Sequence, residues 1–197
     1  NIKKKYKKSD KFKVVIDSNF KKKGKMHYGE ILIPGLSKKE ILISVNICHP
    51  SMANNELSGP LVSMALAKYF SKKKNPRSLR IILIPETIGS IAYINKHFNK
   101  LKKNTIGGYV ITCIGDERNH SFLYSKYENS LSDLAAIKAY KSLKIKYKKY
   151  KFLERGSDER QFNSPIIDLK MSSIMRSKYN KFKEYHRSLD DFKVLTE

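Results

Sequence analysis

Three short runs of consecutive apolar residues constrain the fold of this chain more than any other feature. They span residues 40–48, 78–85 and 108–115. Each run has the length of a strand, and a strand without polar alternation is typically covered on both faces of its sheet. Segments with helical spacing lie between the runs, so strands and helices alternate along the chain. We therefore expect an α/β fold, a three-layer α/β/α sandwich with a mostly parallel central sheet.

Weaker patterns predict the remaining elements. Further strands are expected at residues 13–18, 24–34, 120–124, 148–153 and 172–176. Helices are expected at residues 60–71, 86–98, 130–143 and 188–195, and the third has a Ser-x-x-Asp start signal. Residues 1–11 are dominated by lysine, so we expect a basic disordered segment followed by a single domain over residues 12–197. The chain begins with Asn rather than Met, which suggests part of a longer protein.

The charge is strongly basic. The sequence has 41 Lys and Arg against 18 Asp and Glu, a formal net charge of +23, which would attract nucleic acid. The basic residues are mostly lysine, whereas arginine is typical of bidentate phosphate and guanine contacts. No nucleic-acid-binding motif accompanies the charge. We do not expect nucleic acid as the main partner, and steeply salt-dependent binding to duplex DNA would contradict this view.

The sequence favours a cytoplasmic protein. No apolar run reaches the ~20 residues that span a bilayer, and the N-terminal lysines are followed by no signal-peptide core. The two cysteines, Cys48 and Cys113, are too few for a disulfide framework, so we interpret both as small buried apolar residues. The oligomeric state is left open.

Ionisable residues follow the predicted strands at their carboxyl ends. His49, Glu86 and Asp116 each come directly or closely after one of the three apolar runs, and His186 lies near the end of the chain. Open α/β sheets bind their ligands at this edge. Imidazole and carboxylate together form the ligand set of catalytic zinc. Each residue also has a structural interpretation: His49 and Asp116 suit turns, and Glu86 suits the first turn of a helix.

The order of these motifs resembles a known family. ICHPSMANNELSG, PETIGSIAYI, CIGDERN, ERGSDERQF and EYHRSLDD follow one another between about residue 26 and the C-terminus. The chain resembles the bacterial aminopeptidase-like domains encoded in polysaccharide-biosynthesis loci. These domains are related to zinc aminopeptidases and to hydrolases of the glutamate carboxypeptidase type.

The resemblance implies a set of site residues. It places His49, Asn55, Asp116 and His186 at metal-ligand positions, with Glu56 as an additional oxygen ligand and Thr112 as the alternative to Asp116 in strict register. Glu86 would be the general base for a metal-activated water. Asp158, Arg160 and Tyr185 would line the substrate cleft, and either of the last two, or Arg176, would stabilise an oxyanion.

Two departures from the family pattern affect the metal content. Asn55 and Thr87 stand where the resemblance predicts an aspartate that bridges two metals and a second glutamate ligand. Neutral oxygens bind divalent metal more weakly than carboxylates, so we expect one Zn²⁺ rather than two. The predicted function is hydrolysis of a peptide or amide bond. The alternative is a catalytically inactive domain that binds a ligand or a partner in a polysaccharide-biosynthesis protein.

Overall fold

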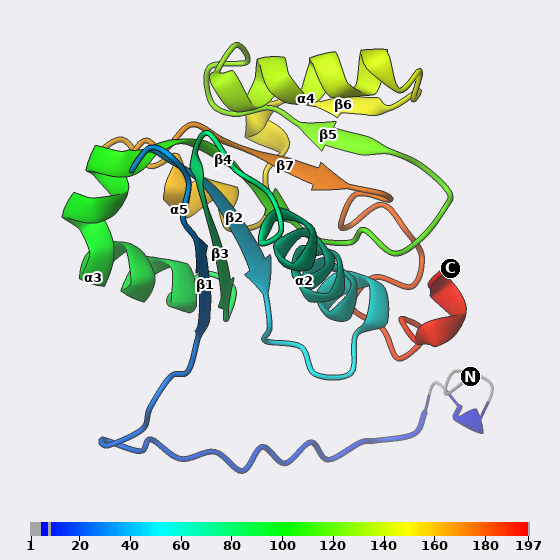
Figure 1. Ribbon diagram of the computed structural model, residues 1–197. Helices are drawn as coiled ribbons and strands as arrows, with labels where there is room; N and C mark the ends of the chain where they lie inside the picture. Colours follow the sequence, from blue (N-terminus) through cyan, green and yellow to red (C-terminus); the bar gives the residue numbers. More distant parts are fainter. Residues whose placement is uncertain (1–4, 8, 197) are drawn as a thin grey trace.

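The structure is a computed structural model that describes residues 5–7 and 9–196. Seven strands form one mixed sheet in the order β1-β3-β2-β4-β7-β5-β6 (Figure 1). They are β1 (Gly29–Ile33), β2 (Glu40–Asn46), β3 (Ser78–Ile84), β4 (Thr105–Ile111), β5 (Ser121–Leu123), β6 (Lys148–Tyr150) and β7 (Met171–Met175). β1 and β3 pair antiparallel, as do β5 and β7, and the other neighbours are parallel. The predicted α/β fold with a mostly parallel sheet is confirmed.

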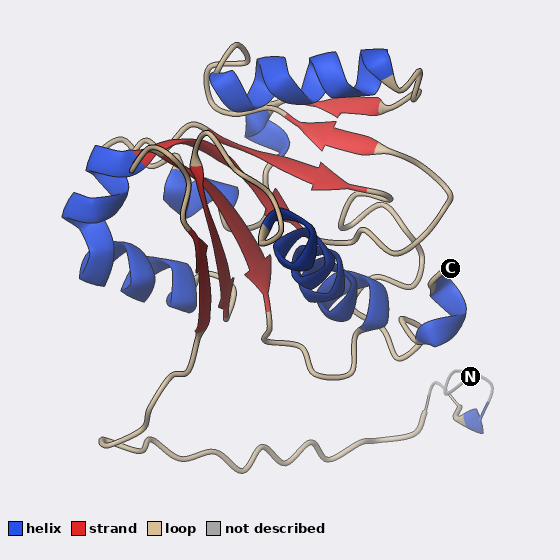
Figure 2. Cartoon of the chain, in the orientation of Figure 1, coloured by secondary structure: helices blue, strands red, loops and turns tan. Residues whose placement is uncertain are grey.

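Helices cover both faces of the sheet (Figure 2). The α-helices are α2 (Ser58–Phe70), α3 (Ile88–Asn104), α4 (Leu131–Ser142) and α5 (Glu159–Phe162). Short segments are the π-helical η1 (Ala53–Leu57) and the 3₁₀-helical η2 (Phe152–Glu154) and η3 (Phe192–Val194). α3 and α5 pack on one face, and α2 packs on the other, where α4 covers the β5 end. None of the helices in the described residues is long and apolar enough to span a bilayer.

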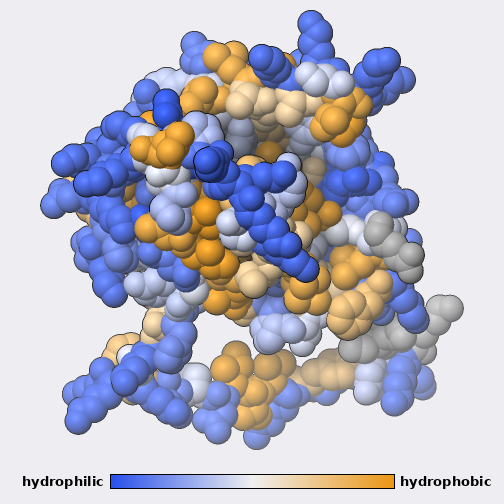
Figure 3. All heavy atoms as spheres, viewed as in Figure 1, coloured by the Kyte–Doolittle hydropathy of each residue, from blue (hydrophilic) through white to orange (hydrophobic). Residues whose placement is uncertain are grey.

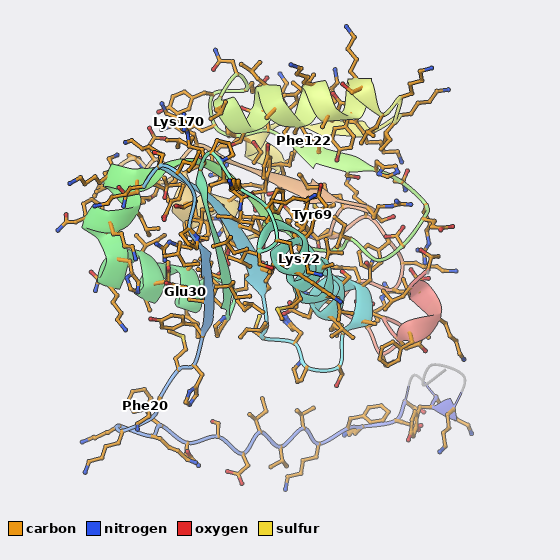
Figure 4. The ribbon with its side chains drawn as sticks, viewed as in Figure 1. Phe20, Glu30, Tyr69, Lys72, Phe122 and Lys170 are labelled. Carbon is orange, nitrogen blue, oxygen red and sulfur yellow. The ribbon has the colours of Figure 1, made fainter. Side chains whose placement is uncertain are left out.

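Successive residues of the central strands point to opposite faces, as the pleat of a strand requires. In β2, Leu42 joins the core beneath α3, whereas Ile43 joins the core beneath α2. Both faces of this strand are covered, which explains why the sequence shows a continuous apolar run. In β5, next to the edge strand β6, Phe122 packs beneath α4 (Figure 4).

The helices cover only part of the sheet face on which α2 packs. A cavity of about 450 Å³ lies between α2 and the strands β2, β4 and β7, and its lining includes Ile41, Phe70, Tyr109 and Ile174. Apolar side chains gather near the middle of this face in the space-filling view (Figure 3). The second layer is therefore incomplete over the centre of the sheet.

A glycine allows α2 to begin close to the end of β4. A side-chain carbon at Gly59 would lie 2.6 Å from the carbonyl oxygen of Ile111, well inside contact distance. Only glycine permits such an approach of helix backbone to strand backbone. This contact fixes η1, which directly precedes α2, over the carboxyl ends of the strands.

Two predicted elements are wrong. Residues 13–18 form no strand: Val14, Val15 and Ile16 are exposed, and no backbone hydrogen bond joins this stretch to the sheet within the described residues. Phe20, which follows in the same segment, also lies away from the sheet (Figure 4). An apolar pattern alone does not make a strand, because the ladder needs a paired neighbour. The helix expected at residues 188–195 is reduced to η3, since the preceding residues make isolated turns.

Candidate metal centre

The carboxyl ends of four strands meet at one edge of the sheet. β2, β3, β4 and β7 run parallel to one another, so the loops that follow them converge. His49 lies in the loop after β2, Glu86 in the loop after β3, and Thr112 directly after β4. This is the edge at which open α/β sheets bind ligands.

Cys48, His49 and Glu56 form a close group. His49 Nδ1 lies 2.9 Å from Glu56 Oε1 and 3.4 Å from Cys48 Sγ, and this sulfur lies 3.8 Å from the same carboxylate oxygen. The backbone N–H of Cys48 donates to Glu56 Oε2 at 2.8 Å. Among the described residues, this is the one group of three or more His, Cys, Asp or Glu side chains whose ligand atoms all lie within 4.8 Å of one another.

The environment of Cys48 favours the protonated thiol. Burial raises the pKa of the Cys48 thiol to about 11. The backbone N–H of Glu86, which donates to the sulfur at 3.3 Å, opposes this rise, and the negative charges of Glu56 and Glu86 add to it. The two carboxylates therefore lie close enough to Cys48 to influence its charge.

His186 lies beside His49. The centres of the two rings are 4.8 Å apart, and His186 stacks on Tyr185 with ring centres 4.0 Å apart. His186 has a φ of 53°, a conformation that costs a non-glycine residue free energy and is found at functional sites. Burial, followed by the negative charges of groups that include Glu86 and Glu56, raises the pKa of the Tyr185 hydroxyl. Tyr185 is thus a neutral hydrogen-bond donor at ordinary pH.

Hydrogen bonds hold the Glu86 side chain through one of its two carboxylate oxygens. Its Oε1 accepts hydrogen bonds from Ser157 Oγ and from Asn46 Nδ2, the latter at 3.2 Å. In the described part of the chain, no hydrogen bond reaches its Oε2. One carboxylate oxygen therefore anchors the side chain and the other is free to accept a proton.

Asn55 supports Glu56. Its Nδ2 donates to Glu56 Oε1 at 2.7 Å, and its backbone N–H donates to Asp190 Oδ2 at 3.0 Å. Asp190 also accepts from the N–H of Asn54 at 2.7 Å, so it fixes the first turn of η1. Asp190 is not among the predicted site residues, although it lies in the EYHRSLDD motif that carries the resemblance.

Asp116 has no lone pair left for a metal. Its Oδ1 accepts from Ser177 Oγ and from the N–H of Arg118, and its Oδ2 accepts from the N–H of Ser177 and from Asn54 Nδ2, at distances between 2.7 and 3.0 Å. Four donors occupy the roughly four acceptor positions of an ionised carboxylate. The predicted role of Asp116 as a ligand therefore does not fit its surroundings, because the residue joins three loops instead.

Asp158 and Arg160 differ in their surroundings. Asp158 is fully buried, and its Oδ1 accepts from the N–H of Thr87 and from Ser90 Oγ, both at 2.8 Å. It therefore supports the turn that follows Glu86. Arg160 is exposed, and its side chain makes no hydrogen bond with the described residues. The predicted substrate contacts of both residues stay predictions.

The group around His49 offers three ligand types in one place. Imidazole, carboxylate and thiolate are the ligand types that zinc prefers. A thiol with a high pKa can still bind, since metal coordination deprotonates it. From the sequence alone, Cys48 is predicted only as a buried apolar residue. Its position directly before His49 was the signal available in the sequence.

Comparison with known proteins identifies the family. The profile of the family described as "Domain of unknown function (DUF4910)" matches residues 9–197. The chain belongs to the DUF4910 family. This DUF4910 chain is 41% identical over 182 residues to a Clostridium acetobutylicum protein provisionally named as a polysaccharide biosynthesis protein with an aminopeptidase-like domain. The match covers 92% of this chain and 41% of the relative. The predicted family resemblance is confirmed.

Solved structures share the DUF4910 fold. A crystal structure from Clostridium acetobutylicum, provisionally named a peptidase, has a TM-score of 0.82 at 39% identity, covering 86% of this chain and 40% of that one. A zinc aminopeptidase from Bacillus subtilis has a TM-score of 0.70 at 14% identity, covering 86% of this chain and 44% of that one. The DUF4910 chain thus spans about two fifths of the length of the relatives it matches. At such low identity, the likeness to the zinc aminopeptidase concerns the fold.

Proposed function

We propose that this chain provides the active site of a zinc-dependent, aminopeptidase-like hydrolase that cleaves a peptide or amide bond. The observation that carries this proposal is the convergence of three residues: His49, which follows β2, Glu56 of η1, and Glu86, which follows the neighbouring parallel strand β3 and whose N–H reaches Cys48 Sγ. His49 and Glu56 would hold the ion, with His186 beside them. When bound, zinc polarises a carbonyl and lowers the pKa of water towards ~7.

The protein groups supply proton transfer and orientation. Glu86 Oε2 would take a proton from the attacking water and pass it to the leaving amine, while Ser157 and Asn46 keep Oε1 fixed. The Tyr185 hydroxyl, which keeps its proton because its pKa is raised, would donate to the oxyanion. Peptidase-like relatives make a peptide or another amide the substrate class to test first.

The inactive alternative has its own support. Asn55 and Thr87 are neutral at two positions where the resemblance predicts carboxylates. At a third position Asp116 has no free lone pair, and its strict-register alternative, Thr112, is neutral. Metal binding without turnover of any amide substrate would favour a ligand-binding domain. The resemblance to polysaccharide-biosynthesis proteins would then point to a partner in that process.

Metal analysis of two variants tests the proposal. The wild type should bind about one equivalent of zinc, His49→Ala should lose it, and Glu86→Gln should retain it. Glu86→Gln should also lose hydrolysis of aminoacyl-anilide substrates by about 10²–10⁴-fold, the usual contribution of a general base. His27→Ala, which changes an exposed histidine on the N-terminal segment, is the matched control. Equal zinc content in wild type and His49→Ala would refute the metal centre.

A further inference from the structure

We propose that Cys48 is itself a metal ligand, so that the ion is bound by sulfur, nitrogen and oxygen from Cys48, His49 and Glu56. This inference rests on the proposed function only in needing a metal at the same place. It assigns the ligands differently from the family resemblance, which selects His49 and no cysteine. It also changes which metals the site prefers.

The separations of the three atoms match a tetrahedral zinc site. Bond lengths of ~2.3 Å to sulfur and ~2.0–2.1 Å to nitrogen or oxygen, at tetrahedral angles, require about 3.5 Å from sulfur to either lighter atom and about 3.3 Å between nitrogen and oxygen. The observed distances are 3.4 Å from Cys48 Sγ to His49 Nδ1, 3.8 Å from Sγ to Glu56 Oε1, and 2.9 Å between Nδ1 and Oε1. Each differs from the required value by a few tenths of an ångström.

Neighbouring groups hold the three side chains in place. Glu56 accepts from the N–H of Cys48 at 2.8 Å and from Asn55 Nδ2 at 2.7 Å, which orients its carboxylate. The N–H of Glu86 donates to Cys48 Sγ at 3.3 Å, as a backbone donor does around a thiolate ligand. Such outer contacts fix ligand orientation in metal sites.

Two anionic ligands from this group would replace the negative charge that is missing at two other positions of the site. Asn55 and Thr87 supply no charge where the resemblance predicts carboxylates. A Cys48 thiolate together with the Glu56 carboxylate restores two negative charges beside the ion. Sulfur also favours zinc and cobalt over magnesium, calcium and manganese.

The ligand count would decide whether the ion can act in catalysis. With three protein ligands, a fourth position stays open for water or substrate, as in catalytic zinc sites. His186, whose ring centre is 4.8 Å from that of His49, is the nearby residue that would close the site if it ligated. A closed four-ligand site is typical of structural zinc.

Cobalt substitution tests the sulfur ligand directly. The protein is loaded with Co²⁺ alone, and its absorption spectrum is recorded for wild type, Cys48→Ser and Cys113→Ala. Cys113 is the matched control, because it is the other cysteine and is buried in a hydrophobic cluster. We expect a sulfur-to-cobalt charge-transfer band in the near ultraviolet that Cys48→Ser abolishes and Cys113→Ala retains. Circular dichroism checks that both variants are folded.

A second measurement applies if the cobalt spectra are weak. Competition with a chromophoric chelator should show at least about tenfold weaker Zn²⁺ binding for Cys48→Ser, since losing even an outer contact costs about 10–100-fold. Cobalt d–d bands without the charge-transfer band, or a band that Cys48→Ser retains, would overturn the sulfur ligand and leave the proposed function intact. Absence of any bound cobalt or zinc would overturn both.

Discussion

Asp158 is a buried carboxylate beside the site, in surroundings that disfavour its charged form. Burial raises its pKa to about 7. The N–H of Thr87 and the hydroxyl of Ser90 oppose the rise, and the charges of Glu86 and Glu159 add to it. Thr87 has a φ of 64°, an outlier for a β-branched residue. Asp158 thus carries an electrostatic cost while it stabilises the strained turn that follows Glu86.

Replacing Asp158 with Asn should change how stability depends on pH. The carboxyl has a pKa near 3.9 when unfolded and about 7 when folded, so between these values the folded state binds more protons. The contribution of Asp158 to stability is therefore most favourable below about pH 4 and falls as pH rises to about 7, by an amount on the order of 2–4 kcal/mol. Asp158→Asn should lack this component.

Urea unfolding of wild type and Asp158→Asn between pH 4 and pH 8 measures the effect. Subtracting the two curves removes the contributions of other groups. A difference that stays constant across this range would show that Asp158 does not titrate as its burial implies.

The start of α4 is specified by a local capping box. Ser130 Oγ accepts from the N–H of Asp133, and the Asp133 carboxylate accepts from the N–H of Ser130 at 2.9 Å. Asp133 also accepts from Ser125 and Ser172, so the cap joins α4 to β7. The Ser-x-x-Asp signal predicted this start from the sequence, because the motif needs only four consecutive residues.

Ser130→Ala should destabilise the protein by about 1 kcal/mol, the usual loss for an N-cap serine. The variant removes one acceptor for the helix N–H groups and one donor to Asp133. Ser142→Ala, at the exposed opposite end of the same helix, is the control and should stay within about 0.5 kcal/mol of wild type. Chemical denaturation measures both, and equal losses in the two variants would contradict the cap.

An ion-pair network centred on the buried residues Arg80 and Glu40, with Glu30 at its exposed edge, connects the strands beneath α3. The Arg80 guanidinium donates from Nε and Nη2 to Glu40, both at 2.9 Å, and from Nη1 to Glu30 at 2.6 Å. Tyr93 of α3 donates to the other oxygen of Glu30. Burial would raise the pKa of Glu30, but the hydrogen bond from Tyr93 and the charge of Arg80 lower it. β1, β2, β3 and α3 therefore share one polar network.

Arg80→Met should destabilise the whole domain by about 3–5 kcal/mol, because it leaves two carboxylates without their buried partner. For a chain of this size, the melting temperature should fall by roughly 6–20 °C. Adding Glu40→Met to this variant should recover much of the loss. Arg77→Met is the control, since Arg77 is an exposed arginine of the loop that precedes β3. A melting temperature unchanged by Arg80→Met would rule out a stabilising role for the network.

The sequence by itself determined the class of fold. Apolar runs at β2, β3 and β4 are buried on both faces, and that pattern is visible without any tertiary contact. The capping box of α4 is equally local. The sequence also selected His49 and Glu86, because residues at strand ends have a predictable place in a parallel sheet. His186 was selected through the family resemblance.

Only the tertiary structure decided which side chains have free lone pairs and which partners they meet. Asp116 follows β4, where a metal ligand is expected. Both of its carboxylate oxygens nevertheless accept hydrogen bonds, from Asn54, Arg118 and Ser177. Conversely, cysteine is a residue type usually found in the core, but the Sγ of Cys48 lies 3.4 Å from His49 Nδ1. Residues 13–18 show a strand pattern without a strand partner. The Asn54 and Ser177 donors to Asp116 come from segments far apart in the sequence, and a strand partner for residues 13–18 would also have to come from elsewhere in the chain. The Cys48–His49 contact is local, but its geometry depends on how the loop after β2 folds.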